Sequence, residues 1–327
     1  MRNFIFAIIT FLAVGINFSG CSLSEDKLKS VPVKLLRFDE VAYGYASQDD
    51  SVKMKLSAQY APVVSLLSKV YGIDSASFIS EYGDSRAVQV FEPDVKARFV
   101  VADSVSDAMG KVSARFAGMF GENGFPAAVY GAIIPFNQSI IVSDTIIAIG
   151  LNHYLGADYE GYEAFEAYRR RMKTPSRMVP DVVEAFVSVR FPYISDMEST
   201  VLSRLIYEGV VVKCMMQLAA VDSAVALGFT PEEYEWAQAN EARIWQALIA
   251  NRLLYSTNPN DAVRLVDPSP VANIINANAP GRVGRYTGLK IVESYLENNP
   301  EAKLENMLTP DFYNDPTVLI KSKYTPR

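Results

Sequence analysis

A charged side chain on the apolar face of a predicted helix is the feature that most constrains how this chain folds. The helix is predicted over residues 199–218, where apolar residues recur with a period near 3.6. Its apolar stripe consists of Val201, Leu205, Glu208, Val212 and Met215. Burying an ionised carboxyl group without a partner is very costly, so Glu208 must be paired, bound to a metal, protonated or facing a polar cavity. The functional expectations depend on which of these conditions holds.

Composition excludes several classes of function. The chain has 327 residues, of which 50% are hydrophobic and 21% charged, as is usual for a folded protein. A net charge of −6 leaves no basic excess to neutralise phosphates, so we expect no nucleic-acid partner. The basic cluster at residues 169–173 is interpreted as the solvated end of a helix. A single histidine, His153, excludes any site built on two imidazoles.

The N-terminus has the pattern of a secretory signal. Residues 1–20 begin with a positive charge and continue into a short apolar run closed by small residues, which predicts a signal peptide. Cys21 follows directly and resembles the acylated cysteine of a bacterial lipobox, which implies a membrane anchor of N-terminal acyl chains. The alternative is an ordinary signal peptide followed by a chance cysteine. Residues 21–34 are predicted to be a polar tether, and residues 35–327 a single folded domain.

Patterns along this domain predict an α+β fold. We expect a strand and its turn at residues 35–45, a strand at 89–101, and two or three adjacent strands within 127–134 and 139–150. Helices are predicted at residues 53–71, 76–82 and 104–120, and the chain is almost entirely helical from residue 159 onward. The N-terminal half therefore contains a small sheet with helices, and the C-terminal half is largely helical.

Two further helices carry charged groups on apolar stripes. Thr230, followed by Pro231 and Glu233, is predicted to form a capping box at the start of a helix that runs to about residue 254. Glu241 lies on the apolar stripe of that helix. The last long helix follows residues 280–281 and carries Arg285 among apolar residues. In this helix Gly284 and Gly288, four residues apart, are expected to let another backbone approach closely.

We therefore expect Arg285 to pair with Glu208, Glu241 or both. An arginine fork can satisfy both oxygens of a carboxylate, which a lysine cannot do in the same way. In one interpretation this buried ionic cluster is a structural ion pair that fixes helix register. In the other it is the wall of a binding cleft.

Several segments of the C-terminal half resemble the GldB family of Bacteroidetes lipoproteins. They are LNHYLGADYEGYEAFEAYRRRM (151–172), VLSRLIYEG (201–209), NEARIWQALIANRLLYS (240–256), LLYSTNP (253–259) and PGRVGRYTGLKIVESYL (280–296). The family is associated with gliding motility and with the secretion machinery of the cell envelope. The resemblance implies a lipid-anchored envelope protein, expected at the outer membrane on its periplasmic or its surface face, with motility or secretion proteins as partners.

GldB-like proteins are similar in turn to predicted zinc metallopeptidases with a zincin-like fold. In those proteins a helix carrying H-E-x-x-H supplies two zinc-binding histidines and a base, and a later glutamate completes the site. Here Glu208 with its following glycine matches the later motif, whereas residues 179–184 contain Asp181 and Glu184 but no histidine. His153 lies in another segment and is expected to be a surface or capping residue.

The resemblance therefore implies a non-catalytic descendant of a metallopeptidase, without a metal or another cofactor. The first alternative is a metal-dependent hydrolase in which Asp181, Glu184 and Glu208 hold a hard cation such as Ca²⁺. The second is a binding module whose former peptidase groove, near Glu208 and Glu241, still takes a peptide or a glycan.

Overall fold

The computed structural model describes residues 33–327 except residues 101–102, 122–123 and 144. The predicted signal peptide, Cys21 and the tether up to residue 32 lie outside the described residues. The domain boundaries stay predictions, although the first strand already begins at Lys34. In the part of the chain that is described, no helix combines the length and the hydropathy that crossing a bilayer requires.

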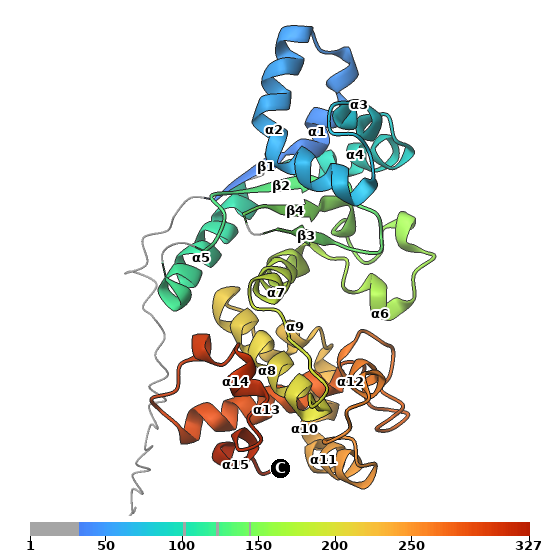
Figure 1. The fold of residues 1–327 in the computed structure, drawn as a ribbon. Coiled ribbons are helices and arrows are strands. Elements are labelled where there is room, and N and C mark those ends of the chain that lie inside the picture. The colour runs from blue at the N-terminus through green and yellow to red at the C-terminus, as the bar shows by residue number, and fades with distance from the viewer. Residues whose placement is uncertain (1–32, 101–102, 122–123, 144) are drawn as a thin grey trace, which may run out of the picture.

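A four-stranded mixed sheet organises the N-terminal half (Figure 1). Its strands are β1 (Lys34–Arg37), β2 (Ala128–Ala132), β3 (Ile140–Val142) and β4 (Ile147–Gly150). Their order is β1-β2-β4-β3, with β1, β2 and β4 parallel and the edge strand β3 antiparallel to β4. All four residues of β4 are buried, as expected for a strand covered on both faces.

Helices cover both faces of this sheet (Figure 1). One face is covered by α1 (Phe38–Tyr43), α2 (Asp50–Tyr71), α3 (Phe78–Gly83) and α4 (Arg86–Arg98). The other face packs against α5 (Asp103–Phe120) and α7 (Met178–Arg190). The short helix α6 (Ala167–Arg170) and the 3₁₀ turns Tyr45–Ser47, Leu151–His153, Glu160–Tyr162 and Pro175–Arg177 lie in the connections. The predicted α+β class with a small sheet is confirmed.

Two sequence predictions in this half are wrong. Residues 89–101 are predicted to form a strand, yet residues 89–98 belong to α4. Ser85 caps this helix by accepting a hydrogen bond from the backbone N–H of Val88, and the buried positions are Val88, Glu92 and Val95, a helical spacing. Residues 35–45 form a strand only as far as Arg37, after which the chain turns directly into α1.

The C-terminal half consists of helices stacked beneath α7 (Figure 1). They are α8 (Val201–Leu218), α9 (Ser223–Leu227), α10 (Pro231–Ala239), α11 (Glu241–Ala250), α12 (Pro259–Val266), α13 (Val283–Asn298), α14 (Pro310–Tyr313) and α15 (Val318–Ser322), with a 3₁₀ turn at Leu304–Asn306. The capping box at Thr230 is present, but the predicted helix to residue 254 is interrupted at Asn240. The Asn240 amide donates to the Trp236 carbonyl oxygen, so this side chain closes α10 before α11 begins.

Helices α8 and α13 pack backbone against backbone in the centre of this half. A Cβ atom placed on Gly288 would overlap the carbonyl group of Leu205, and one placed on Gly209 would overlap the backbone of Gly288. Gly284 likewise faces the side chain of Leu205 and the backbone of Leu265. The predicted close approach at Gly284 and Gly288 is therefore confirmed, and Gly209 contributes to it from the opposite helix.

We predict that Gly288→Ala lowers the free energy of unfolding by about 3 kcal/mol or more, because the methyl group meets backbone that cannot rotate away. Urea unfolding measures the change. Gly44→Ala is the matched control, since a Cβ atom there would have no neighbour closer than 3.7 Å. An equal, small effect of both substitutions would contradict the close packing of α8 and α13.

Candidate functional site

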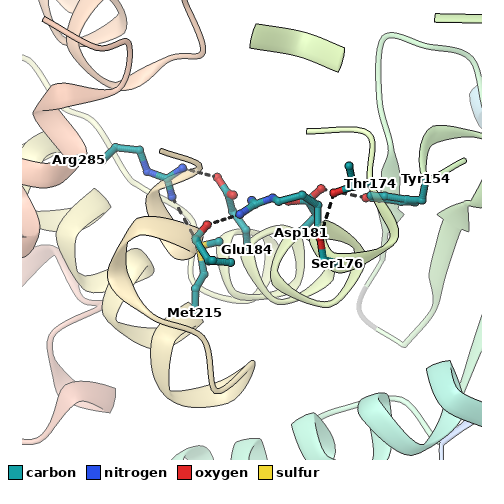
Figure 2. Close-up of polar contacts among 9 residues, drawn as sticks. Tyr154, Thr174, Ser176, Asp181, Glu184, Met215 and Arg285 are labelled. Atoms are coloured by element: carbon teal, nitrogen blue, oxygen red, sulfur yellow. Dashed lines mark hydrogen bonds and ion pairs between the residues drawn. The ribbon is translucent and has the colours of Figure 1, made fainter. Parts of the chain in front are cut away.

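Helices α7, α8 and α13 meet at a junction where acidic side chains face arginines (Figure 2). Asp181 and Glu184 project from α7, Glu208 from α8 and Arg285 from α13. We use the name helix-junction cluster for three carboxylates and three guanidinium groups. Its members are Asp181, Glu184, Glu208, Arg177, Arg204 and Arg285.

Arg285 lies between two of these carboxylates. Its side chain is 2% exposed, its Nη1 donates to Glu184 Oε1 at 2.8 Å, and its Nε lies 3.1 Å from Glu208 Oε2. Nη2 points to the Met215 sulfur at 3.8 Å. Burial by itself would lower the pKa of Arg285, but the two carboxylates outweigh burial and raise it. The guanidinium group therefore stays charged and joins α7 and α8 to α13.

The other two arginines pair with the carboxylate oxygens of Glu208 and Asp181 that Arg285 does not contact. Arg204 Nη2 lies 2.8 Å from Glu208 Oε1, one helical turn away on the same helix. Arg177 donates to Asp181 Oδ1 at 2.7 Å and, through its other nitrogen, to the carbonyl oxygen of Val225. Each carboxylate of the cluster thus faces at least one guanidinium group, and the charges balance.

Burial and charge act differently on the two acids of α7. Burial raises the pKa of Asp181. The charge of Arg177 and the hydroxyl group of Tyr154, which donates to Oδ2 at 3.1 Å, lower this pKa, but by less than burial raises it. Burial would also raise the pKa of Glu184, but the charges of Arg285, Arg282 and Arg177 exceed this effect and lower the pKa to about 2. Glu184 is therefore ionised at neutral pH, although only 27% of its side chain is exposed.

Glu241 lies outside the helix-junction cluster. Its carboxylate accepts hydrogen bonds from Tyr286 at 2.8 Å and from Tyr324 at 3.0 Å, so neutral hydroxyl groups satisfy it. The break at Asn240 makes Glu241 the first residue of α11, where it is buried against α13 and the C-terminal segment. The sequence left open whether Arg285 pairs with Glu208, Glu241 or both. The structure places Glu184, which was not considered as its partner, in the second position.

The expectation that His153 is a surface or capping residue is wrong. The imidazole ring is 2% exposed, and its Nε2 lies 3.1 Å from the Ile134 carbonyl oxygen and 3.2 Å from that of Pro135. Its Nδ1 lies 3.1 Å from the ammonium nitrogen of Lys173. Because carbonyl oxygens only accept, the proton is on Nε2, and Nδ1 accepts from Lys173. Both ring nitrogens are occupied by these contacts, none of which involves a carboxylate of the helix-junction cluster.

A cavity of about 500 Å³ opens beside the helix-junction cluster. Asp181 and Glu184 belong to its wall, but Glu208 and Glu241 do not. The rest of the wall includes groups that the sequence did not single out, among them Phe136, Lys173 and Arg282. The basic cluster at residues 169–173 begins in the last turn of α6, where Arg169 is exposed, as predicted for the solvated end of a helix. Arg169, Arg171 and Lys173 also line this cavity, which the sequence did not indicate.

Potential metal ligands and nucleophiles are otherwise sparse in the described part of the chain. No group of three or more histidine, cysteine, aspartate or glutamate side chains there is arranged to hold a metal ion. The thiol group of Cys214 is fully buried on α8, and burial raises its pKa, so it acts as a packing group.

A scan against known protein families matches residues 22–326 to the family described as gliding motility protein GldB. This chain belongs to the GldB family. The match covers every described residue except Arg327, so α7, α8, α13 and the cavity all lie within the family region. No curated protein and no solved structure matches the chain. Family membership indicates a cell-envelope lipoprotein associated with gliding motility.

We predict that Glu208→Gln lowers the free energy of unfolding by about 3 kcal/mol, because it removes the carboxylate partner of Arg204 and one of the two carboxylate partners of the buried Arg285. Equilibrium unfolding in urea measures the loss. Glu293→Gln is the control, since Glu293 also faces two cations, Lys213 and Lys290, but at a more exposed site. We expect less than about 1 kcal/mol there. A loss below about 0.5 kcal/mol for Glu208→Gln would contradict a tight pair and favour a polar cleft wall.

The stability of the folded chain should depend on pH through His153. Burial and the neighbouring charge of Lys173 lower the pKa of His153 from 6.5 to about 3. Between these values the unfolded chain binds more protons than the folded chain, so stability decreases as the pH falls below about 6.5. We expect a loss of about 2 kcal/mol between pH 7 and pH 5 from this residue.

Urea unfolding at both pH values, compared with the variant His153→Gln, measures this contribution. The glutamine amide can donate to the same carbonyl oxygens but does not titrate, so the variant should lose about 2 kcal/mol less than the parent over this range. Identical pH dependence in both proteins would show that His153 is accessible to protons in the folded state.

Proposed function

We propose that this GldB-family chain is a non-catalytic, lipid-anchored component of the cell envelope that works with motility or secretion proteins. The observation that carries this proposal is the position of Arg285, which lies within 3.1 Å of carboxylates from both α7 and α8. A cation that needed these carboxylates as ligands would have to displace a buried guanidinium group. The arginine thus supplies the positive charge that a metal ion would supply in an enzyme of this plan.

We further propose that the fold is zincin-like and descends from a metallopeptidase. Two features support this: α7 occupies the sequence position of an H-E-x-x-H helix, and α7 and α8 bring Asp181, Glu184 and Glu208 to one junction. Zinc sites of that class need neutral imidazole ligands. The side chain of His153 instead has both ring nitrogens engaged, by carbonyl oxygens and by Lys173.

The lipid anchor in this proposal is carried by Cys21, which lies outside the described residues. Several acyl chains bury enough methylene groups to hold a protein stably at a membrane, whereas a single chain binds only reversibly. The outer membrane is the proposed location, and the folded domain then presents its surface to other envelope proteins.

Metal analysis of the detergent-extracted, full-length chain tests the non-catalytic role. After dialysis against trace zinc and calcium we expect substoichiometric amounts of both metals, because arginines already neutralise the three carboxylates. The paired variant Glu184→Gln/Glu208→Gln, which removes two candidate ligands, should give the same metal content. One zinc or calcium ion per chain in the parent, lost in the paired variant, would instead establish the metal-dependent hydrolase with Asp181, Glu184 and Glu208 as ligands.

A further inference from the structure

The wall of the cavity beside the helix-junction cluster carries an excess of positive charge. Its two acids, Asp181 and Glu184, are already paired with Arg177 and Arg285. Among its cations, only Arg171 has a carboxylate partner within the described residues, namely Glu233, which it contacts through two hydrogen bonds of 2.8 Å each. Three cations therefore remain unbalanced, and they are Arg169, Lys173 and Arg282.

Of these three cations, Arg282 gives the strongest indication of a bound anion. Its Nη1 atom is buried, yet it has no hydrogen-bond partner among the described residues. Burial lowers the pKa of Arg282, and the nearby charge of Arg285 contributes in the same direction, while Glu184 opposes both. A guanidinium group stays protonated under these conditions. A buried donor without an acceptor is costly, and because Arg282 lines the cavity, an acceptor bound there can satisfy its guanidinium group.

Lys173 supplies a second cation held in a fixed position. Its ammonium group lies 4.9 Å from the ring centroids of Phe136 and Phe165 and 5.3 Å from that of Tyr162. The proton on His153 Nε2 leaves Nδ1 as an acceptor, which holds the ammonium group at 3.1 Å. The charged groups that influence Lys173 are Arg169 and Asp181, and burial with Arg169 lowers its pKa to about 8. Lys173 is therefore mostly charged at neutral pH.

The cavity also has an apolar side. Phe136 and Phe165, with the partly exposed Tyr168 and Met172, line the wall near Lys173. A volume of about 500 Å³ falls in the range of small-ligand sites, which pair an apolar lining with a few placed polar groups.

From this arrangement we propose that the cavity binds a small monoanionic carboxylate that carries an aromatic or apolar side chain, with Arg282 and Lys173 receiving the carboxylate. The source is a free acid or the C-terminal residue of a peptide. A guanidinium fork matches the two oxygens of a carboxylate. A dianionic phosphate is disfavoured, because Asp181 and Glu184 form part of the same wall. The inference goes beyond the envelope role and does not depend on the chain being non-catalytic.

Calorimetric titration of the detergent-extracted, full-length chain at pH 7 tests the proposal. The probes are N-acetyl-phenylalanine, a tripeptide ending in phenylalanine, the amide of each, and inorganic phosphate. We expect saturable binding of at least one acid with one site per chain, and at least tenfold weaker binding of its amide, because the amide lacks the charge. The acid that binds more tightly identifies the source, since only the tripeptide extends beyond one residue.

Variants identify the receiving groups. Arg282→Gln and Lys173→Gln should each weaken binding of the acid about tenfold or more. Arg252→Gln is the matched control and should leave binding unchanged. Both arginines have a left-handed backbone (φ 54° at Arg252 and 64° at Arg282), but Arg252 is exposed and is not part of the cavity wall. Circular dichroism checks that each variant is folded.

Three outcomes overturn the proposal. They are equal binding of acid and amide, tighter binding of phosphate than of either acid, and no saturable binding of either acid. Each is measured on the parent chain, so the test remains decisive even if Arg282→Gln does not fold. Undiminished binding by folded Arg282→Gln and Lys173→Gln would equally reject these two residues as the receiving groups.

Discussion

The ion pairs of Arg285 are the interaction on which the junction of the two halves depends. This side chain starts from α13, in the helical half, and reaches carboxylates on α8 and on α7, the helix that packs against the sheet. A buried ionic contact adds little net stability compared with apolar packing, but it is costly to break and it tolerates few alternative geometries. Arg285 therefore sets how α7, α8 and α13 are aligned.

The alignment is possible only because α8 and α13 approach so closely. Gly209 and Gly288 face each other, and neither could carry a side chain without displacing backbone. Because the two helices pack so closely, Arg285 on α13 contacts Glu208 on α8 and also Glu184 on α7. Backbone packing and charge pairing thus support each other at one place in the fold.

Charge is distributed unevenly around α7. On the side of the helix-junction cluster, three carboxylates meet three arginines, so each carboxylate already has a positively charged partner. In the neighbouring cavity, cations outnumber free acids, and the Nη1 atom of Arg282 lacks an acceptor among the described residues. The carboxylates that would hold a cation in the metal-dependent alternative are therefore paired internally, whereas the adjoining cavity carries an excess of positive charge. The carboxylates of Asp181 and Glu184 belong to both.

Local patterns in the sequence determined much of this protein. Helical periodicity placed Glu208 and Arg285 on buried faces, the capping box at Thr230 marked a helix start, and glycine spacing indicated close packing. The same patterns misread α4, where valines at helical spacing were mistaken for a strand, because β-branched residues fit both elements when they are buried. Family membership also follows from sequence, since the match spans residues 22–326.

Only the tertiary structure decided which charged groups meet. Glu184 and Arg285 are 101 residues apart in the sequence. Lys173 and His153 meet beside a cluster of aromatic rings that no spacing in the sequence predicts. Partners of this kind depend on where α7, α13 and the loop after β2 converge. Periodicity predicts which face of an element is buried. A contact between two side chains depends on the positions of two elements at once, so the sequence alone could not predict the ionic cluster or the cavity.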